Sequence, residues 1–261
     1  MRLLKIIAIT FAQYSRIPVP RFEWAEADMK YCLSVFPWVG AVTGLLFYGV
    51  FAGGVPAALP ETAVTLLLTA VPLLVTGGFH VDGFLDVEDA LSSWRSREEK
   101  LRILKDPHIG AFAVIRLAIF GLIWLAALRT ILALPSARQL VMIVSAGFFL
   151  SRAFSAWGVL TLKPAKDTGM LAREAAEAKQ ADRINRVLTA LWIVLGIAGM
   201  CLVSPLPGLL TAAAALLAFL WYRYKSLKEF GGVTGDTAGY YVVLSETWML
   251  VAAAAAGLLM K

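Results

Sequence analysis

The sequence predicts an all-α fold: a polytopic integral-membrane helical bundle with about seven transmembrane helices. Hydrophobic residues make up 59% of the 261 residues and charged residues only 16%, whereas a soluble domain is about a quarter charged. Apolar runs recur along the chain at lengths close to the about 20 residues that span a bilayer. In a membrane protein, the net charge of +6 reflects basic loops that set the topology and that contact anionic lipid headgroups. A soluble domain and a nucleic-acid-binding protein are therefore excluded.

Seven apolar runs are long enough, or nearly so, to cross a membrane. The predicted spans are Cys32–Gly53, Thr62–Thr76, Gly110–Leu134, Leu140–Leu162, Val187–Val203, Gly208–Tyr222 and Tyr241–Met260. The second run is short for a bilayer, so we expect it to continue into the Gly77-Gly78 pair. Residues 1–31 are expected to lie at the cytoplasmic membrane surface, because Lys5 interrupts their apolar part and no signal-peptide cleavage site follows.

Positive charges gather on one side of this arrangement. Of the 24 Lys and Arg residues, 19 lie in the N-terminal segment and in the loops after the second, fourth and sixth spans, while Arg129, Arg138 and Lys261 lie on the other side. The positive-inside rule therefore predicts a cytoplasmic N-terminus and an external C-terminus. We expect one membrane-embedded domain, residues 1–261, with a catalytic cytoplasmic loop at residues 77–109. The two cysteines would lie at opposite faces, which argues against a disulfide between them.

Three aspartates follow the second span at helical spacing. If residues 82–89 form a helix, Asp82, Asp86 and Asp89 fall within an arc of roughly 60°, and Glu88 points to another side. Like charges three or four residues apart destabilise a helix, so a cation is expected among them. Ligands that are all oxygens suit Mg²⁺, Mn²⁺ or Ca²⁺. The alternative is an acidic face that is only solvated. We favour the cation site because the aspartates directly follow an apolar run and a Gly-Gly break.

Three charged residues fall inside predicted spans: Arg116, Arg152 and Glu246. Each costs about 3 kcal/mol in hydrocarbon on insertion scales and normally faces the interior of a bundle. One interpretation is a structural ion pair between Glu246 and either arginine. The other is an anion-binding wall beneath the acidic segment, since one glutamate cannot neutralise two arginines.

A glycine-rich stretch, residues 230–240, precedes the last span. Its glycines can expose successive backbone N–H groups, and the start of the following helix adds positive potential for a phosphate. Such a turn is also often a mere connector. His80 and His108 could serve as general bases or phosphate ligands, or they could be hydrogen-bonded structural groups.

The motifs together resemble one enzyme family. GGFHVDGFLDVEDA followed by ILKDPHIGAFAV, with SRIPVP and FPWVG before them and GGVTGD after them, is similar to the cobalamin synthase family. Its members are adenosylcobinamide-GDP ribazoletransferases, integral-membrane enzymes of late cobalamin assembly. Family members commonly have Leu at the positions of Phe79 and Phe84 and Gly at that of Ala90. Val81 stands where many members have an acidic residue, so that position cannot be an essential ligand here.

The resemblance implies a Mg²⁺-dependent phosphoryl transfer at the cytoplasmic face of a prokaryotic cell membrane. The 5′-hydroxyl of α-ribazole, or of its phosphate, would attack the cobinamide-linked phosphorus of adenosylcobinamide-GDP, and GMP would leave. The catalytic set that the resemblance implies is His80 as base, Asp82, Asp86 and Asp89 as metal ligands, and Lys105 as a counter-charge. The substrate-binding set is Arg116, Arg152, Gly232, Thr234, Gly235, Asp236 and Glu246. A homo-oligomer, or a complex with other cobalamin-assembly enzymes, is compatible with it.

Two other functions share features with this one. A CDP-alcohol phosphotransferase also carries spaced aspartates on membrane helices, but its longer motif has Arg after Ala, and here Leu91 follows Ala90. A divalent-cation or corrinoid transporter would place acidic residues at mid-membrane, whereas nearly all of those in this chain fall in predicted cytoplasmic segments. Release of GMP, release of CMP, or uptake without chemistry would discriminate among the three.

Overall fold

The computed structural model describes residues 2–20, 23, 25–54, 59–165 and 170–261. All regular secondary structure in these ranges is helical, and an isolated parallel bridge joins Pro164 to Val233. The all-α prediction is therefore confirmed. Arg21 and Lys166, two of the basic residues counted for the topology, lie outside the described residues.

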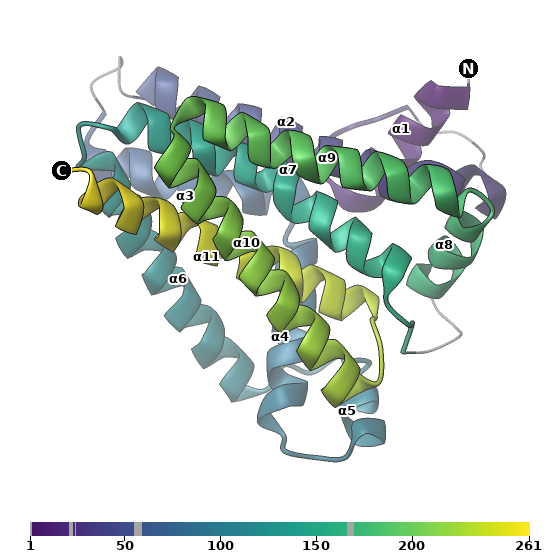
Figure 1. Cartoon of the computed structure of the whole chain (residues 1–261). Helices are drawn as coiled ribbons and strands as arrows, with labels where there is room; N and C mark the ends of the chain where they lie inside the picture. The colour runs from purple at the N-terminus through teal and green to yellow at the C-terminus, as the bar shows by residue number, and fades with distance from the viewer. Residues whose placement is uncertain (1, 21–22, 24, 55–58, 166–169) are drawn as a thin grey trace.

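The helices follow one another along the chain as Figure 1 shows. Their bounds are α1 Arg2–Tyr14, η1 Glu26–Tyr31, α2 Cys32–Gly54, α3 Glu61–Thr76, α4 Phe79–Ser92, α5 Arg97–Ile103, α6 Ala111–Leu132, α7 Ala137–Thr161, α8 Met170–Lys179, α9 Asp182–Val203, α10 Pro205–Lys225, η2 Ser226–Phe230 and α11 Gly235–Leu259. The segment expected as a catalytic loop thus contains two helices, α4 and α5.

Six helices of the described chain are long and apolar enough to cross a membrane: α2, α6, α7, α9, α10 and α11. A seventh span exists only if α3 and α4, which meet at an angle of 91°, count as one broken span. The expected continuation of the second span is wrong. Gly77 and Gly78 adopt φ values of 63° and 81°, a left-handed conformation that ends the helix at Thr76 and turns the chain.

Helix α7 lies at the centre of the bundle and packs against α2, α9, α10 and α11. The closest approach is to α2, where a Cβ added at Gly40 or Gly44 would overlap the backbone carbonyl of Phe148 or Ser145. These two glycines, four residues apart on one side of α2, therefore form a small-residue packing face. By contrast, α6 and α9 expose large apolar side chains such as Leu122 and Val194, which suits contact with lipid.

The bend after α3 directs α4 across the beginning of α11 (Figure 1). A Cβ added at Gly83 would lie 2.9 Å from the carbonyl oxygen of Asp236, so only a glycine allows this close crossing. A Cβ added at Gly239 of α11 would lie 3.4 Å from the backbone of His80, an ordinary contact distance, so the two helices are also close at this position. The crossing brings together the two polar motifs of the sequence, which lie about 150 residues apart.

Candidate active site

The acidic face of α4 forms as the spacing predicts, and it gains a fourth carboxylate. Burial, together with the charges of Asp236, Asp82 and Asp89, raises the pKa of Asp86 from its ordinary value to about 6. Asp236 belongs to the first turn of α11. The predicted repulsion among the aspartates is therefore present, and the glycine-rich turn contributes to it through Asp236.

The chemistry of this donor set fits a hard divalent cation, because every ligand would be an oxygen and the carboxylates repel one another without a cation. As placed, no group of three or more His, Cys, Asp or Glu side chains in the described part of the chain surrounds a common point closely enough to hold a metal ion. The Asp89 carboxylate lies against the backbone of Gly110, so close that a Cβ added at Gly110 would overlap it. Metal binding would require these side chains to turn toward one another.

A cavity of about 310 Å³ opens beside the acidic face. It brings together residues from separate predicted motifs: His80, Asp82, Lys105, Thr234, Gly235 and Asp236. Lys105 is exposed and forms no ion pair with a described residue, so its ammonium group can contact an anion in the cavity. Asp86 and Asp89 lie further along α4.

The glycine-rich turn offers fewer backbone donors than its sequence suggests. Thr234 and Thr237 cap α11 reciprocally, each hydroxyl accepting a hydrogen bond from the other's backbone N–H. The N–H groups of Gly232 and Val233 donate to Ser226 and Lys163. The expected row of free N–H groups for a phosphate is therefore largely engaged within the protein. Thr234, Gly235 and Asp236 line the cavity, whereas Gly232 packs tightly against the backbone of residues 163–165.

The two histidines differ in their surroundings. His80 is buried with its ring near those of Phe36 and Phe79, and neither ring nitrogen has a hydrogen-bond partner among the described residues. His108 is exposed, and its Nδ1 lies 2.8 Å from the Asp106 carboxylate in the loop before α6. His80 therefore borders the cavity without a carboxylate to orient its ring, whereas His108 lies outside the cavity.

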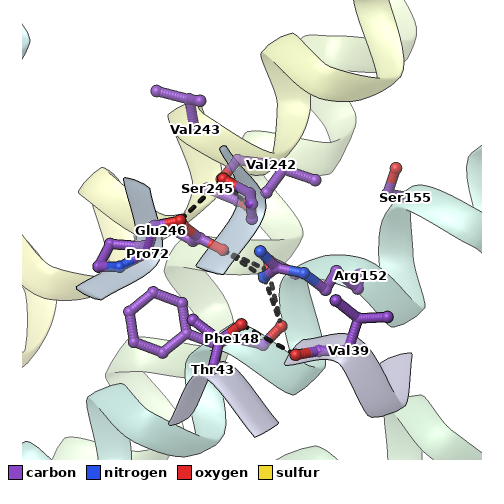
Figure 2. Close-up of polar contacts among 12 residues, drawn as sticks. Val39, Thr43, Pro72, Phe148, Arg152, Ser155, Val242, Val243, Ser245 and Glu246 are labelled. Atoms are coloured by element: carbon purple, nitrogen blue, oxygen red, sulfur yellow. Dashed lines mark hydrogen bonds and ion pairs between the residues drawn. The ribbon is translucent and has the colours of Figure 1, made fainter. Parts of the chain in front are cut away.

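The charges inside the spans form a buried ion pair (Figure 2). Arg152 donates to the Glu246 carboxylate at 2.6 Å and to the carbonyl oxygen of Phe148 at 2.9 Å, and the Ser151 hydroxyl donates to Glu246 at 3.0 Å. This arrangement is the structural pair expected for Glu246. Arg116 lies 3.7 Å from Glu88 instead, on the other side of α4 from the acidic face. Neither arginine lines the 310 Å³ cavity.

Sequence reasoning missed a polar cluster at the far wall of the cavity. Glu174 of α8 is 1% exposed, and its Oε2 accepts hydrogen bonds from Tyr14 at 2.5 Å and Gln13 at 3.2 Å. Burial raises the pKa of Glu174 to about 7. No local motif marks these residues, because their contact joins α1 to α8 across about 160 positions of the sequence.

Known proteins of one family are similar to this chain over almost its whole length. A family model described as cobalamin-5-phosphate synthase matches residues 6–254 of the chain. The chain belongs to the cobalamin-5-phosphate synthase family. A relative from Lachnoclostridium phytofermentans, named adenosylcobinamide-GDP ribazoletransferase, is 39% identical over 94% of this chain and 92% of its own. Relatives of the same name from Geobacillus kaustophilus and Clostridium perfringens are 32% and 29% identical over 90% and 93% of this chain, and 89% and 94% of their own.

Family membership makes the protein a transferase of cobalamin synthesis embedded in a membrane. No solved structure matches the chain. In this member of the cobalamin-5-phosphate synthase family, the candidate site is lined by α1, α2, α4, α7, α8 and the start of α11. Chemically, the arrangement can hold a small ligand against a concentrated negative charge, with Lys105 as the positive side chain at the same wall.

Proposed function

We propose that the chain joins adenosylcobinamide-GDP to α-ribazole or α-ribazole 5′-phosphate, giving adenosylcobalamin or its 5′-phosphate, and releases GMP. The names of the relatives and of the family support these substrates. The observation that carries the proposal is the crossing of α4 and α11, which puts Asp82 and Asp236 at the wall of a cavity large enough for a nucleoside, with Asp86 and Asp89 further along α4. Phosphoryl transfer depends mainly on positioning and on neutralising charge, which suits such a site.

The bonds made and broken follow from the products. An oxygen of the acceptor attacks the phosphorus linked to cobinamide, the P–O bond to GMP breaks, and GMP keeps the bridging oxygen. The proton of the attacking hydroxyl passes to a base. The family description names a 5-phosphate product, and an acceptor whose 5′-oxygen already carries a phosphate cannot attack through that oxygen. Another ribose hydroxyl is therefore the nucleophile, in place of the 5′-hydroxyl expected from the sequence.

The residues divide this work between charge and position. Lys105, which lines the cavity, would contact a phosphate oxygen, and the aspartates Asp82, Asp86, Asp89 and Asp236 are the residues that would hold Mg²⁺. When bound, Mg²⁺ would neutralise the diphosphate and stabilise the oxygen of the leaving group. His80 is a weaker candidate for the base than its sequence position suggests, because no carboxylate orients its ring. Arg152 and Glu246 pair with each other outside the 310 Å³ cavity, so we expect them to support the bundle.

The proposed location is the cytoplasmic side of the cell membrane. The basic residues that set the predicted orientation lie in the segments that contain α5 and α8, at the same end of the bundle as the cavity. A cytoplasmic cavity would give access to water-soluble nucleotides, while the surrounding helices keep the site at the membrane.

The test is an assay of purified protein in detergent with adenosylcobinamide-GDP, α-ribazole or its phosphate, and Mg²⁺. We expect one GMP released for each corrinoid product, measured by chromatography and mass spectrometry. Release should require both substrates and should stop when EDTA removes the divalent ion. No product from folded protein with both substrates would contradict the proposal, and release of CMP from a CDP-alcohol would favour the phospholipid synthase instead.

A further inference from the structure

Two cavities of different size meet at the acidic face. The first is the 310 Å³ cavity, and the second is an open groove of about 1260 Å³ between α1 and the bend from α3 to α4. Gln13, Phe79 and Asp82 line both. A ligand in one cavity and a ligand in the other would therefore approach each other across Asp82.

The sizes separate the two substrates of the proposed reaction. A volume of about 310 Å³ lies at the lower end of the range for small-molecule sites, near the size of a nucleoside. A corrin macrocycle is far larger than a nucleoside and needs an open groove. The groove at α1 exceeds the usual range of about 300–1,000 Å³ and opens to the surface.

One part of the wall of the smaller cavity is apolar. Leu33, Phe36 and Val159 line it together with the ring of Tyr14. A base without exocyclic polar groups, such as a benzimidazole, loses few hydrogen bonds to water when it packs against these side chains. Guanine would lose the hydrogen bonds of its N–H and carbonyl groups there. The apolar wall thus favours the acceptor nucleoside over the guanosine end of the donor.

Glu174 supplies a specific polar contact in that cavity. Its Oε2 is held by Tyr14 and Gln13, but its Oε1 is buried and has no hydrogen-bond partner in the described part of the chain. A buried carboxylate oxygen without a partner is costly. A hydroxyl group of a ligand in the cavity would satisfy it, and Tyr14 and Gln13 fix the carboxylate in position to receive that hydroxyl.

We propose that the acceptor nucleoside occupies the smaller cavity, with a non-reacting ribose hydroxyl donating to Glu174 Oε1, and that the corrinoid part of the donor occupies the groove at α1. This inference rests on the proposed function. It makes Glu174 a residue that binds the acceptor, and it places the reacting hydroxyl and the diphosphate on either side of Asp82.

The first test compares Glu174→Gln with the matched control Glu177→Gln, on the same helix and outside the cavity. Gln has the same side-chain volume as Glu. Its carbonyl oxygen can still accept the hydrogen bond from Tyr14, but its NH₂ group then faces the cavity in place of Oε1 and cannot accept a hydrogen bond from a ligand hydroxyl. We expect the KM for α-ribazole, measured at pH 8 where the Glu174 carboxylate is ionised, to rise about 10- to 100-fold in Glu174→Gln, the range for losing a hydrogen bond to a charged group. The KM for adenosylcobinamide-GDP should stay unchanged, and Glu177→Gln should resemble the wild type.

The second test fills the groove. Ala12 is exposed on α1 and lines the groove, so Ala12→Trp should raise the KM for adenosylcobinamide-GDP and leave binding of labelled α-ribazole, measured by equilibrium dialysis, unchanged. Size-exclusion chromatography checks that each variant is folded. Two results together would overturn the inference and assign the smaller cavity to guanosine. One is that GMP competes with labelled α-ribazole for binding. The other is that Glu174→Gln changes only the KM for adenosylcobinamide-GDP. Wild-type protein that binds neither substrate would contradict the proposed function itself.

Discussion

The aspartates at the crossing of α4 and α11 interact as one charged set, since burial together with the charges of three of them raises the pKa of the fourth, Asp86. Replacing Asp82, Asp86 or Asp236 by Asn removes one charge and keeps the volume. We expect each change to lower kcat by several orders of magnitude, because phosphoryl transfer depends on the divalent ion that these groups would hold. Titrating Mg²⁺ or Mn²⁺ in the GMP-release assay should partly restore activity.

The control for these variants must be an acidic residue that the fold does not use. Glu88 is unsuitable, because it is buried and pairs with Arg116. Glu98 is exposed in the first turn of α5, so Glu98→Gln should turn over normally. If Asp86→Asn were as active as Glu98→Gln, the acidic face would have no part in the reaction.

The pair of Arg152 and Glu246 tests a structural role at the same scale. Removing one member leaves a buried charge without a partner, which costs about 3–5 kcal/mol, whereas replacing both is often nearly neutral. We expect Glu246→Gln to lower the melting temperature of the protein in detergent. The double variant with Arg152→Gln should recover both the melting temperature and the activity. A stable but inactive double variant would show that these charges contact substrate.

Glu174 should make stability depend on pH. The folded protein holds a proton on Glu174 up to about pH 7, while an unfolded chain loses it near the ordinary value of 4.5. The folded state therefore binds more protons between these values, and the free energy of unfolding should fall as pH rises from 4.5 to 7, by on the order of 3 kcal/mol. Melting temperatures measured across this window should fall more steeply for the wild type than for Glu174→Gln. Parallel curves would show that Glu174 is not buried.

At the scale of elements, the bend between α3 and α4 decides where the aspartates point. Gly78 has a φ of 81° and no atom within 4 Å of an added Cβ, so Gly78→Ala tests backbone conformation alone. A left-handed alanine costs about 1–2 kcal/mol. We expect a lower melting temperature and a loss of activity larger than the loss of stability, because α4 would be redirected.

The matched control for the bend is Gly49→Ala in α2, which also has open space around an added Cβ but lies within a helix. Alanine there should be neutral or should stabilise the protein by about 0.5–1 kcal/mol. Equal effects of the two changes on activity would contradict a special role for the bend.

The elements also show how far sequence reasoning reached. The spacing of Asp82, Asp86 and Asp89 predicted their shared face because helical periodicity is local. Apolar length likewise found the spans, but it failed at Gly77, where a backbone conformation, not hydropathy, ends the helix. The contact between Tyr14 and Glu174 could not be predicted, because it depends on how α1 and α8 pack and neither helix carries a pattern that names the other.

At the scale of the whole molecule, ion pairs confirm which segments lie together. Lys100 of α5 pairs with Glu229 of η2 at 2.6 Å, and Lys5 of α1 pairs with Asp28 of η1. Glu61, at the start of α3, pairs with Arg129 near the end of α6. Each pair joins residues that the predicted topology places on one side, so the alternation of spans agrees with the packing.

The orientation of the bundle is the last expectation to test. In a background with Cys32→Ala and Cys201→Ala, single cysteines at Glu98, Lys179 and Glu61 would report one side each, because all three positions are in exposed or terminal segments. Since basic segments stay in the cytoplasm, a membrane-impermeant maleimide should label Glu61→Cys in intact cells. It should label Glu98→Cys and Lys179→Cys only in inverted vesicles. Labelling of Glu98→Cys from outside would invert the bundle, place the cavity outside the cell, and separate the aspartates from the cytoplasmic nucleotides that the proposed reaction needs.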